Sequence, residues 1–123
     1  MFERSQVSVS ELKSQMKRGE EPFFVNLRHS HDWDLAVMKA RGALNLADDE
    51  VEQHMEEIPR NRPVIIYSRC PGDEPSIRAA EILRQHGWQD VHPLVGGFKA
   101  YLEAGLPVEE IGEGSKTRKI MLL

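Results

Sequence analysis

The only cysteine of the sequence, Cys70, lies where a predicted strand passes into a predicted helix. Residues 63–67 before it are apolar and β-branched, which predicts a buried parallel strand. After it, the turn-forming residues 71–76 lead to a predicted helix over residues 77–86, which Gly87 ends. Backbone N–H groups and the helix dipole at such a junction lower the pKa of a thiol below its free value of about 8.5. The placement favours a nucleophilic thiolate over the alternative, a small buried apolar side chain.

The segment after the cysteine is the predicted substrate-binding loop, made of Pro71, Gly72, Asp73, Glu74, Pro75 and Ser76. Its two carboxylates, Asp73 and Glu74, would raise the pKa of a nearby thiolate and repel a dianionic donor. The equal alternative is that they cap the N-terminus of the following helix. Arg69 and Arg78 flank the loop and would offset its negative charge if they point inward.

One further candidate supporting residue, Arg28, stands at the exit of an earlier predicted strand, residues 23–27. It either faces the mouth of the site or forms a structural ion pair. A metal site is not expected, because His29, His31 and Asp32 lack a clear third ligand and are typical of a solvated surface.

The elements that must position the loop alternate along the chain. Ser8 and Glu11 form a capping box that opens a helix ending at Gly19. Further strands are predicted over residues 42–46 and 91–94, a helix over 98–104 after a turn at 96–97, and a short helix or turn over 31–38. A polar helix is predicted over residues 48–58, with Val51 and Met55 on one face and Asp48 or Asp49 as its cap.

Strands that alternate with helices predict an α/β fold, a central, mostly parallel sheet with helices on both faces. Ligands of such sheets bind outside the carboxyl ends of the strands. Cys70 follows the carboxyl end of the predicted central strand, so the fold rule and the local pattern indicate the same site.

Composition narrows the classes of function. The 123 residues carry a net charge of −4 without a basic stripe, so no nucleic-acid partner is expected. No apolar run is long enough to span a bilayer, and the first residues lack the apolar core of a secretory signal. One cysteine forms no internal disulfide, which suits a reducing compartment. We expect a cytoplasmic protein without a membrane partner, one domain over residues 1–123 with its core over about 7–109 and a polar tail at 112–123.

Four stretches, in order, resemble the single-domain rhodanese family of sulfurtransferases. They are residues 25–28 (Val-Asn-Leu-Arg), 41–46 (Arg-Gly-Ala-Leu-Asn-Leu), 64–76 around the cysteine, and 94–107 (Leu-Val-Gly-Gly-Phe-Lys-Ala-Tyr-Leu-Glu-Ala-Gly-Leu-Pro). In the family a serine follows the catalytic cysteine by six residues, and Ser76 follows Cys70 by six. The resemblance therefore implies that Cys70 is the nucleophile. Ser68, which stands where the family often has its cysteine, is the weaker alternative.

The resemblance implies a three-layer rhodanese-like domain and an activity that needs no cofactor. Cys70 would take a sulfane sulfur from a small donor, thiosulfate or a persulfide, and pass it to a thiol or to cyanide. A phosphatase would need arginine where Ser76 stands. Two departures from the family pattern, the loop without a basic residue and Asn26 in place of the usual aspartate, favour the alternative of a non-catalytic rhodanese-like module that binds a partner protein.

Overall fold

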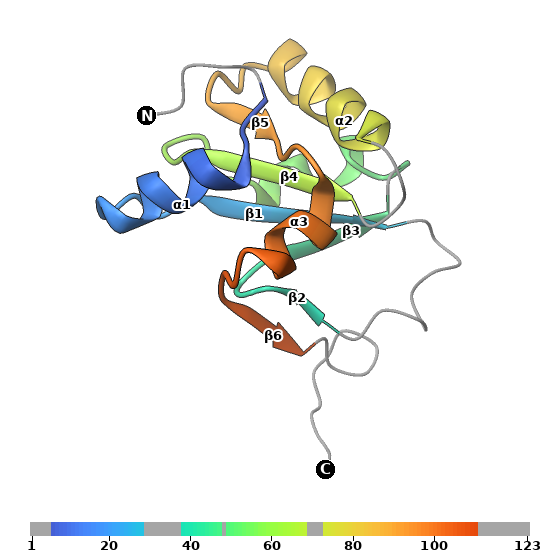
Figure 1. Cartoon of the computed structure of the whole chain (residues 1–123). Coiled ribbons are helices and arrows are strands. Elements are labelled where there is room, and N and C mark those ends of the chain that lie inside the picture. Colours follow the sequence, from blue (N-terminus) through green and yellow to red (C-terminus); the bar gives the residue numbers. More distant parts are fainter. Residues whose placement is uncertain (1–5, 29–37, 48, 69–72, 111–123) are drawn as a thin grey trace.

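Four parallel strands form the main sheet, in the order β3-β1-β4-β5 (Figure 1). The structure is a computed structural model that describes residues 6–28, 38–47, 49–68 and 73–110. The strands of this sheet are β1 (Phe23–Arg28), β3 (Leu44–Ala47), β4 (Val64–Ser68) and β5 (Val91–Pro93). The helices are α1 (Val9–Lys17), α2 (Glu74–Gln85), α3 (Gly97–Glu103) and the 3₁₀ helix η2 (Glu52–Glu57), and an antiparallel ribbon joins β2 (Met38–Ala40) to β6 (Val108–Glu110).

Side chains of the central strands alternate between two hydrophobic cores. In β4, Ile65 and Tyr67 pack with α1 and α3, whereas Val64 and Ile66 pack with α2. All five residues of β4 are buried, as expected for a parallel strand covered on both faces. The prediction of a mostly parallel sheet with helices on both faces is therefore confirmed.

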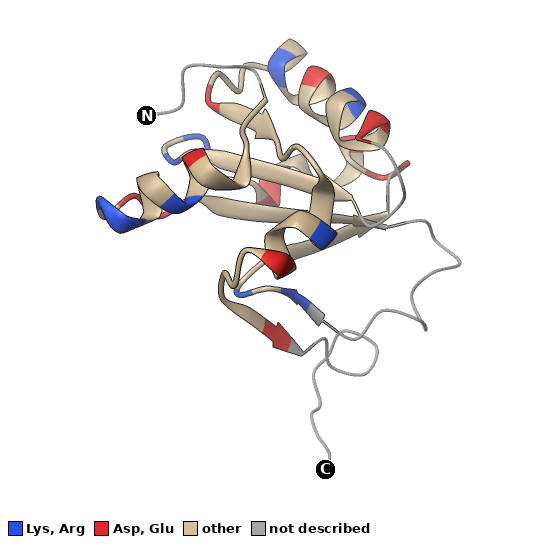
Figure 2. Ribbon diagram, in the orientation of Figure 1, with Lys and Arg blue, Asp and Glu red and all other residues tan. Residues whose placement is uncertain are grey.

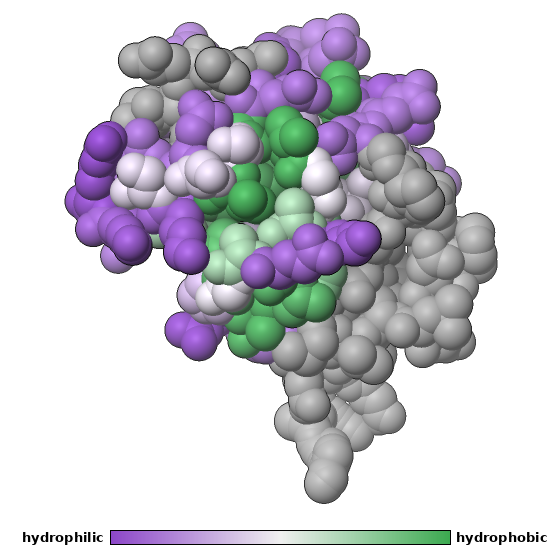
Figure 3. Space-filling view, viewed as in Figure 1, coloured by the Kyte–Doolittle hydropathy of each residue, from purple (hydrophilic) through white to green (hydrophobic). Residues whose placement is uncertain are grey.

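The face that carries α1 and α3 is shown in Figure 3, where hydrophobic residues gather around α3. Two large apolar side chains of the described residues are well exposed, Val95 at 44% and Leu102 at 48%. Isolated exposed apolar side chains are ordinary on protein surfaces. Leu102 is thus an exposed leucine on α3, in contrast to the buried leucines of the two cores.

The predicted polar helix over residues 48–58 is wrong in type and extent. The chain forms the shorter η2, which is kinked at His54 (φ −122°, ψ 19°). Its N-cap is Val51, and no side chain caps it; Asp48 lies outside the described residues. Val51 and Ile58 are both buried at 3% exposure, so packing at the two ends of this polar segment overrides its weak helical pattern.

The ribbon of β2 and β6 was not expected from the sequence. Met38 begins β2 instead of ending a helix or turn, and residues 31–37 lie outside the described part of the chain. The backbone N–H of Ala40 donates a 2.9 Å hydrogen bond to the Tyr67 hydroxyl, which ties β2 to the central strand. Strands of three residues are too short to show an alternating pattern.

Tyr101 of α3 provides a test of this packing at alkaline pH. Its side chain is fully buried, and its hydroxyl donates a 2.6 Å hydrogen bond to the Pro107 carbonyl oxygen. Burial raises the pKa of Tyr101 from 10.0 to about 12, and the Arg41 charge lowers it by a smaller amount.

Because the folded pKa of Tyr101 exceeds the unfolded one, its contribution to stability is complete below pH 10 and is lost as the pH rises toward 12. Between pH 10 and 12, we expect ionisation of Tyr101 to lower the free energy of unfolding by up to about 2 kcal/mol. The Tyr101→Phe variant has no group to ionise and should not show this decrease. Urea titrations of both proteins across the interval measure the slopes. If the free energy of unfolding falls equally with pH in both proteins, the raised pKa of Tyr101 is contradicted.

Candidate functional site

The predicted site lies at the carboxyl edge of the main sheet, where β4 ends at Ser68 and α2 begins at Glu74. Of the predicted site residues, Cys70, Arg69, Pro71 and Gly72 lie outside the described residues. The structure describes both sides of this connection and the turn at Gly96 and Gly97, which lies against Ser68 and is hydrogen-bonded to Asp73.

The first end, Ser68, is packed against the start of α3. Its side chain is 2% exposed. A Cβ atom on Gly97 would lie only 2.5 Å from the Ser68 carbonyl oxygen, so that carbonyl approaches the α3 backbone more closely than any other residue permits. Gly97 also has a φ of +62°, in the left-handed region that glycine adopts most readily.

The second end, Asp73, is held by hydrogen bonds of both its side chain and its backbone. The Gly96 backbone N–H donates to Asp73 Oδ2 at 3.2 Å. The Asp73 carbonyl oxygen accepts from the Ser76 hydroxyl at 2.8 Å and from the Ile77 N–H at 3.0 Å. Asp73 occupies the N-cap position of α2, but its side chain makes no capping hydrogen bond. Capping by this carboxylate, one of the two predicted roles, is therefore wrong: the side chain reaches α3 instead.

The predicted start of α2 at residue 77 is three residues late. Glu74, Pro75 and Ser76 form its first turn instead of belonging to the loop. Proline suits this position because the first N–H groups of a helix have no partner within the helix. Ser76 is fully buried, and its hydroxyl donates a hydrogen bond to the Asp73 carbonyl oxygen, which stabilises this turn.

The second acidic residue, Glu74, faces solvent. Its side chain is 80% exposed and lies 3.4 Å from the Arg78 guanidinium, itself 59% exposed. Figure 2 shows acidic and basic residues alternating along α2. Arg78 therefore pairs with Glu74 on the helix surface and does not supply the inward positive charge considered from the sequence.

Arg28 is placed only by its backbone. It is the last residue of β1, one position beyond Leu27, which pairs with Ser68. Its backbone therefore lies at the same sheet edge as the predicted site, and its side chain lies outside the described part of the structure.

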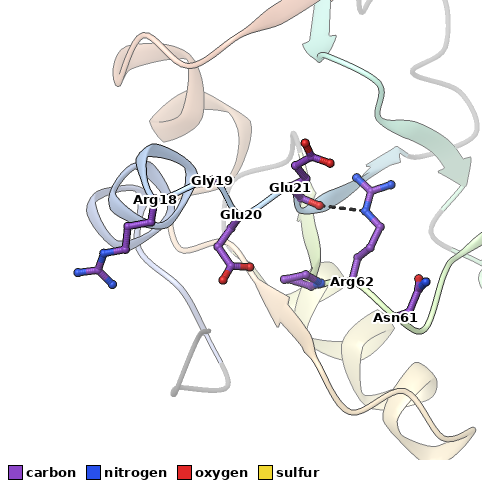
Figure 4. Close-up of a pocket in the computed structure, with 7 residues that line it drawn as sticks. Arg18, Gly19, Glu20, Glu21, Asn61 and Arg62 are labelled. Atoms are coloured by element: carbon purple, nitrogen blue, oxygen red, sulfur yellow. Dashed lines mark hydrogen bonds between the residues drawn. The ribbon is translucent and has the colours of Figure 1, made fainter.

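A surface pocket of about 400 Å³ lies at the opposite edge of the sheet, before the first residues of β1 and β4 (Figure 4). Arg18, Glu20, Glu21 and Arg62 give it mixed charge, and Arg62 Nε donates to the Glu21 carbonyl oxygen at 2.9 Å. Its lining holds neither a thiol nor a histidine. Among the described residues, no group of three or more His, Cys, Asp or Glu side chains is arranged to hold a metal ion.

The Gly96–Gly97 turn was predicted only as a turn, and its contact with both ends of the loop was missed. The available signal was a pair of glycines between a strand and a helix, which indicates positive φ or a close backbone approach. The turn's partners, Ser68 and Asp73, stand 29 residues before Gly97 and 23 residues before Gly96, and they carried no local signal.

Comparisons with a family profile and with known sequences agree on the family that this chain resembles. The profile of the Rhodanese-like domain family matches residues 8–104. The chain is 30% identical over 94 residues to a protein of Vibrio cholerae named thiosulfate sulfurtransferase GlpE, covering 76% of this chain and 85% of that protein.

Solved structures give the same result for the fold. The rhodanese-like domain of the Anabaena protein Alr3790 aligns with a TM-score of 0.70 at 26% identity, covering 97% of this chain and 88% of that one. A full-length protein of Lactobacillus plantarum aligns with a TM-score of 0.72 at 15% identity, covering 86% and 88% of the two chains. Within the described residues, no helix has the length and apolar character needed to cross a membrane.

Proposed function

Because this chain belongs to the rhodanese-like domain family, we propose that it is a sulfurtransferase that carries sulfur as a persulfide on Cys70. The observation that carries the proposal is the position of the only cysteine. It falls in the short connection between the carboxyl end of β4 and the first turn of α2. The Asp73 end of that connection is hydrogen-bonded to Gly96, and the Ser68 end lies against Gly97. Ligands of parallel α/β sheets bind at this edge.

The proposed reaction has two displacement steps. The Cys70 thiolate attacks the outer sulfur of thiosulfate, a new S–S bond forms, and the original S–S bond breaks as sulfite leaves with the electron pair. The cysteine persulfide anion is then attacked at its outer sulfur by cyanide or a thiolate, which releases thiocyanate or a new persulfide and restores the thiolate. No net electrons are gained or lost, so no cofactor is needed.

The residues around Cys70 have proposed supporting roles. The backbone N–H groups that residues 72–74 contribute would stabilise the anionic sulfur, as successive N–H groups do in anion-binding nests. Arg69 and Arg28 are proposed to add positive charge at this edge. A reducing, cytoplasmic setting would keep the thiol free for the cycle.

Intact mass spectrometry tests the proposal. After incubation with thiosulfate or with a low-molecular-weight persulfide, we expect the protein to gain the mass of one sulfur atom, and cyanide to remove it. Cys70→Ser, the matched control, should gain nothing because a hydroxyl is a far weaker nucleophile for sulfur. Absence of the gain on the unmodified protein with both donors would contradict the sulfurtransferase proposal.

A second candidate function is a non-catalytic module that binds a partner protein. It is favoured by Asn26, which stands where the family usually has aspartate. Asn26 is fully buried, and its Nδ2 donates to Asn45 Oδ1 at 2.9 Å, while its own Oδ1 has no hydrogen-bond partner among the described residues. Titration of the Cys70 thiol separates the two functions. A pKa well below about 8.5 supports catalysis, and one at or above that value supports the binding module.

A further inference from the structure

We propose that Asp73 is a specificity-determining residue of the sulfur transfer, and that its fixed carboxylate disfavours donors with more than one negative charge. This inference rests on the proposed function. It differs from a general effect of acidic loop residues because the structure separates the two carboxylates. One is held at the end of the loop, and the other extends into solvent.

The Asp73 carboxylate accepts a hydrogen bond from the start of α3, and the Asp73 backbone is bonded into the first turn of α2. The Gly96 N–H at the start of α3 holds Oδ2 at 3.2 Å. The Asp73 carbonyl oxygen is bonded to Ser76 and Ile77 in the first turn of α2. This hydrogen bond and the bonded backbone favour one position of the negative charge.

The charge of Asp73 also lacks a neutralising partner in the described part of the chain, where no lysine or arginine forms an ion pair with it. The adjacent Glu74 differs from Asp73 both in the exposure of its side chain and in having an ion-pair partner. It is 80% exposed and pairs with Arg78. Glu74 therefore offers a control for negative charge at nearly the same place in the sequence.

The sequence separation limits how far Asp73 can lie from Cys70. Asp73 follows Cys70 by three residues, and three residues of extended chain span at most about 11 Å between Cα atoms. Across about 10 Å near a protein surface at low salt, one unit charge changes the free energy of another enough to alter a rate about two- to tenfold. The effect grows with the charge of the donor.

Two variants isolate this effect. Asp73→Asn removes the charge and keeps an oxygen that can accept from the Gly96 N–H, whereas Glu74→Gln removes the neighbouring charge. The donors are thiosulfate, a dianion, and methanethiosulfonate, a monoanion with a similar leaving group. We expect Asp73→Asn to raise the ratio of kcat/KM for thiosulfate to kcat/KM for methanethiosulfonate about two- to tenfold at low ionic strength. Glu74→Gln should leave this ratio nearly unchanged.

Alkylation of Cys70 provides a readout that needs no sulfur transfer. Iodoacetate carries a negative charge and iodoacetamide carries none, and both react with the same thiolate. The ratio of their rate constants therefore cancels the thiolate fraction. We expect Asp73→Asn to raise the rate of iodoacetate relative to iodoacetamide about two- to tenfold, and Glu74→Gln to change it little. Because Cys70 is the only cysteine, the modified protein reports on one site.

The outcomes separate this inference from the proposed function. If the protein accepts no sulfur from any donor, the proposed function fails, and the alkylation ratio still tests whether Asp73 excludes anions. An equal change in Glu74→Gln, or an unchanged ratio in Asp73→Asn, would overturn the inference. Should Asp73→Asn fail to fold, Asp73→Ser removes the same charge and is measured in its place.

Discussion

Replacing Gly97 by alanine is expected to lower the free energy of unfolding by about 2–4 kcal/mol. The new Cβ would lie 2.5 Å from the Ser68 carbonyl oxygen, which belongs to the backbone of the central strand and cannot rotate away. The left-handed φ of +62° adds a conformational cost of about 1–2 kcal/mol for any residue with a Cβ. Urea denaturation of the two proteins measures the difference.

The matched control is Gly105→Ala, at the other end of the same helix. Gly105 has a similar φ of +75°, but an added Cβ there meets nothing within 4 Å. This variant should lose only the conformational cost of about 1–2 kcal/mol. Equal losses for the two variants would contradict the predicted collision between the new Cβ and the Ser68 carbonyl oxygen.

Replacing Leu83 by alanine is expected to lower the free energy of unfolding by about 3–4 kcal/mol. Leu83 is fully buried in the core between α2 and the sheet, where it packs in one cluster with Ile66 and Trp88. Removing the branched end of Leu83 leaves a cavity that the surrounding strands cannot fill. The loss of packing also weakens the attachment of α2, whose first turn follows the proposed site.

Leu102→Ala makes the same chemical change on α3, where the side chain is 48% exposed. Its expected cost is below about 1 kcal/mol, because water already reaches much of the side chain and alanine is the better helix former. Chemical denaturation of both variants, followed by circular dichroism, compares the costs. Similar losses would contradict the burial of Leu83 between α2 and the sheet.

The sequence predicted best the elements whose local signals agree with their tertiary packing. The apolar run at residues 63–67 was predicted to be a strand and forms β4 (Val64–Ser68), and the Ser8–Glu11 capping box begins α1 as predicted. The α2 pattern was recognised from its apolar positions, yet its start was placed late, because residues 72–75 (Gly-Asp-Glu-Pro) are typical of a turn. A proline in the first turn of a helix gives the same local signal as a proline in a loop.

The remaining features depend on residues far apart in the sequence. The β2–β6 ribbon pairs Ala40 with Val108, and neither segment is long enough to predict its partner. At the candidate site, the type and sequence position of Asp73 were evident, but its role was not. Its carboxylate was assigned to capping or to donor selection. Capping is wrong, because the carboxylate accepts a hydrogen bond from Gly96, on a turn that follows a different strand, and donor selection stays a prediction.

The hydrogen bond between Gly96 and Asp73 has a consequence for local opening of the protein. It joins residues that are 23 positions apart in the sequence, with α2 and β5 between them. The start of α3 and the residue that precedes α2 are therefore linked by one hydrogen bond. Segments that are linked by shared contacts tend to open as one cooperative unit. The Gly96 amide can therefore exchange with solvent only when the Asp73 carboxylate releases it. Exchange at this single amide, far from Cys70 in the sequence, would report how firmly the proposed sulfur-carrying segment is held.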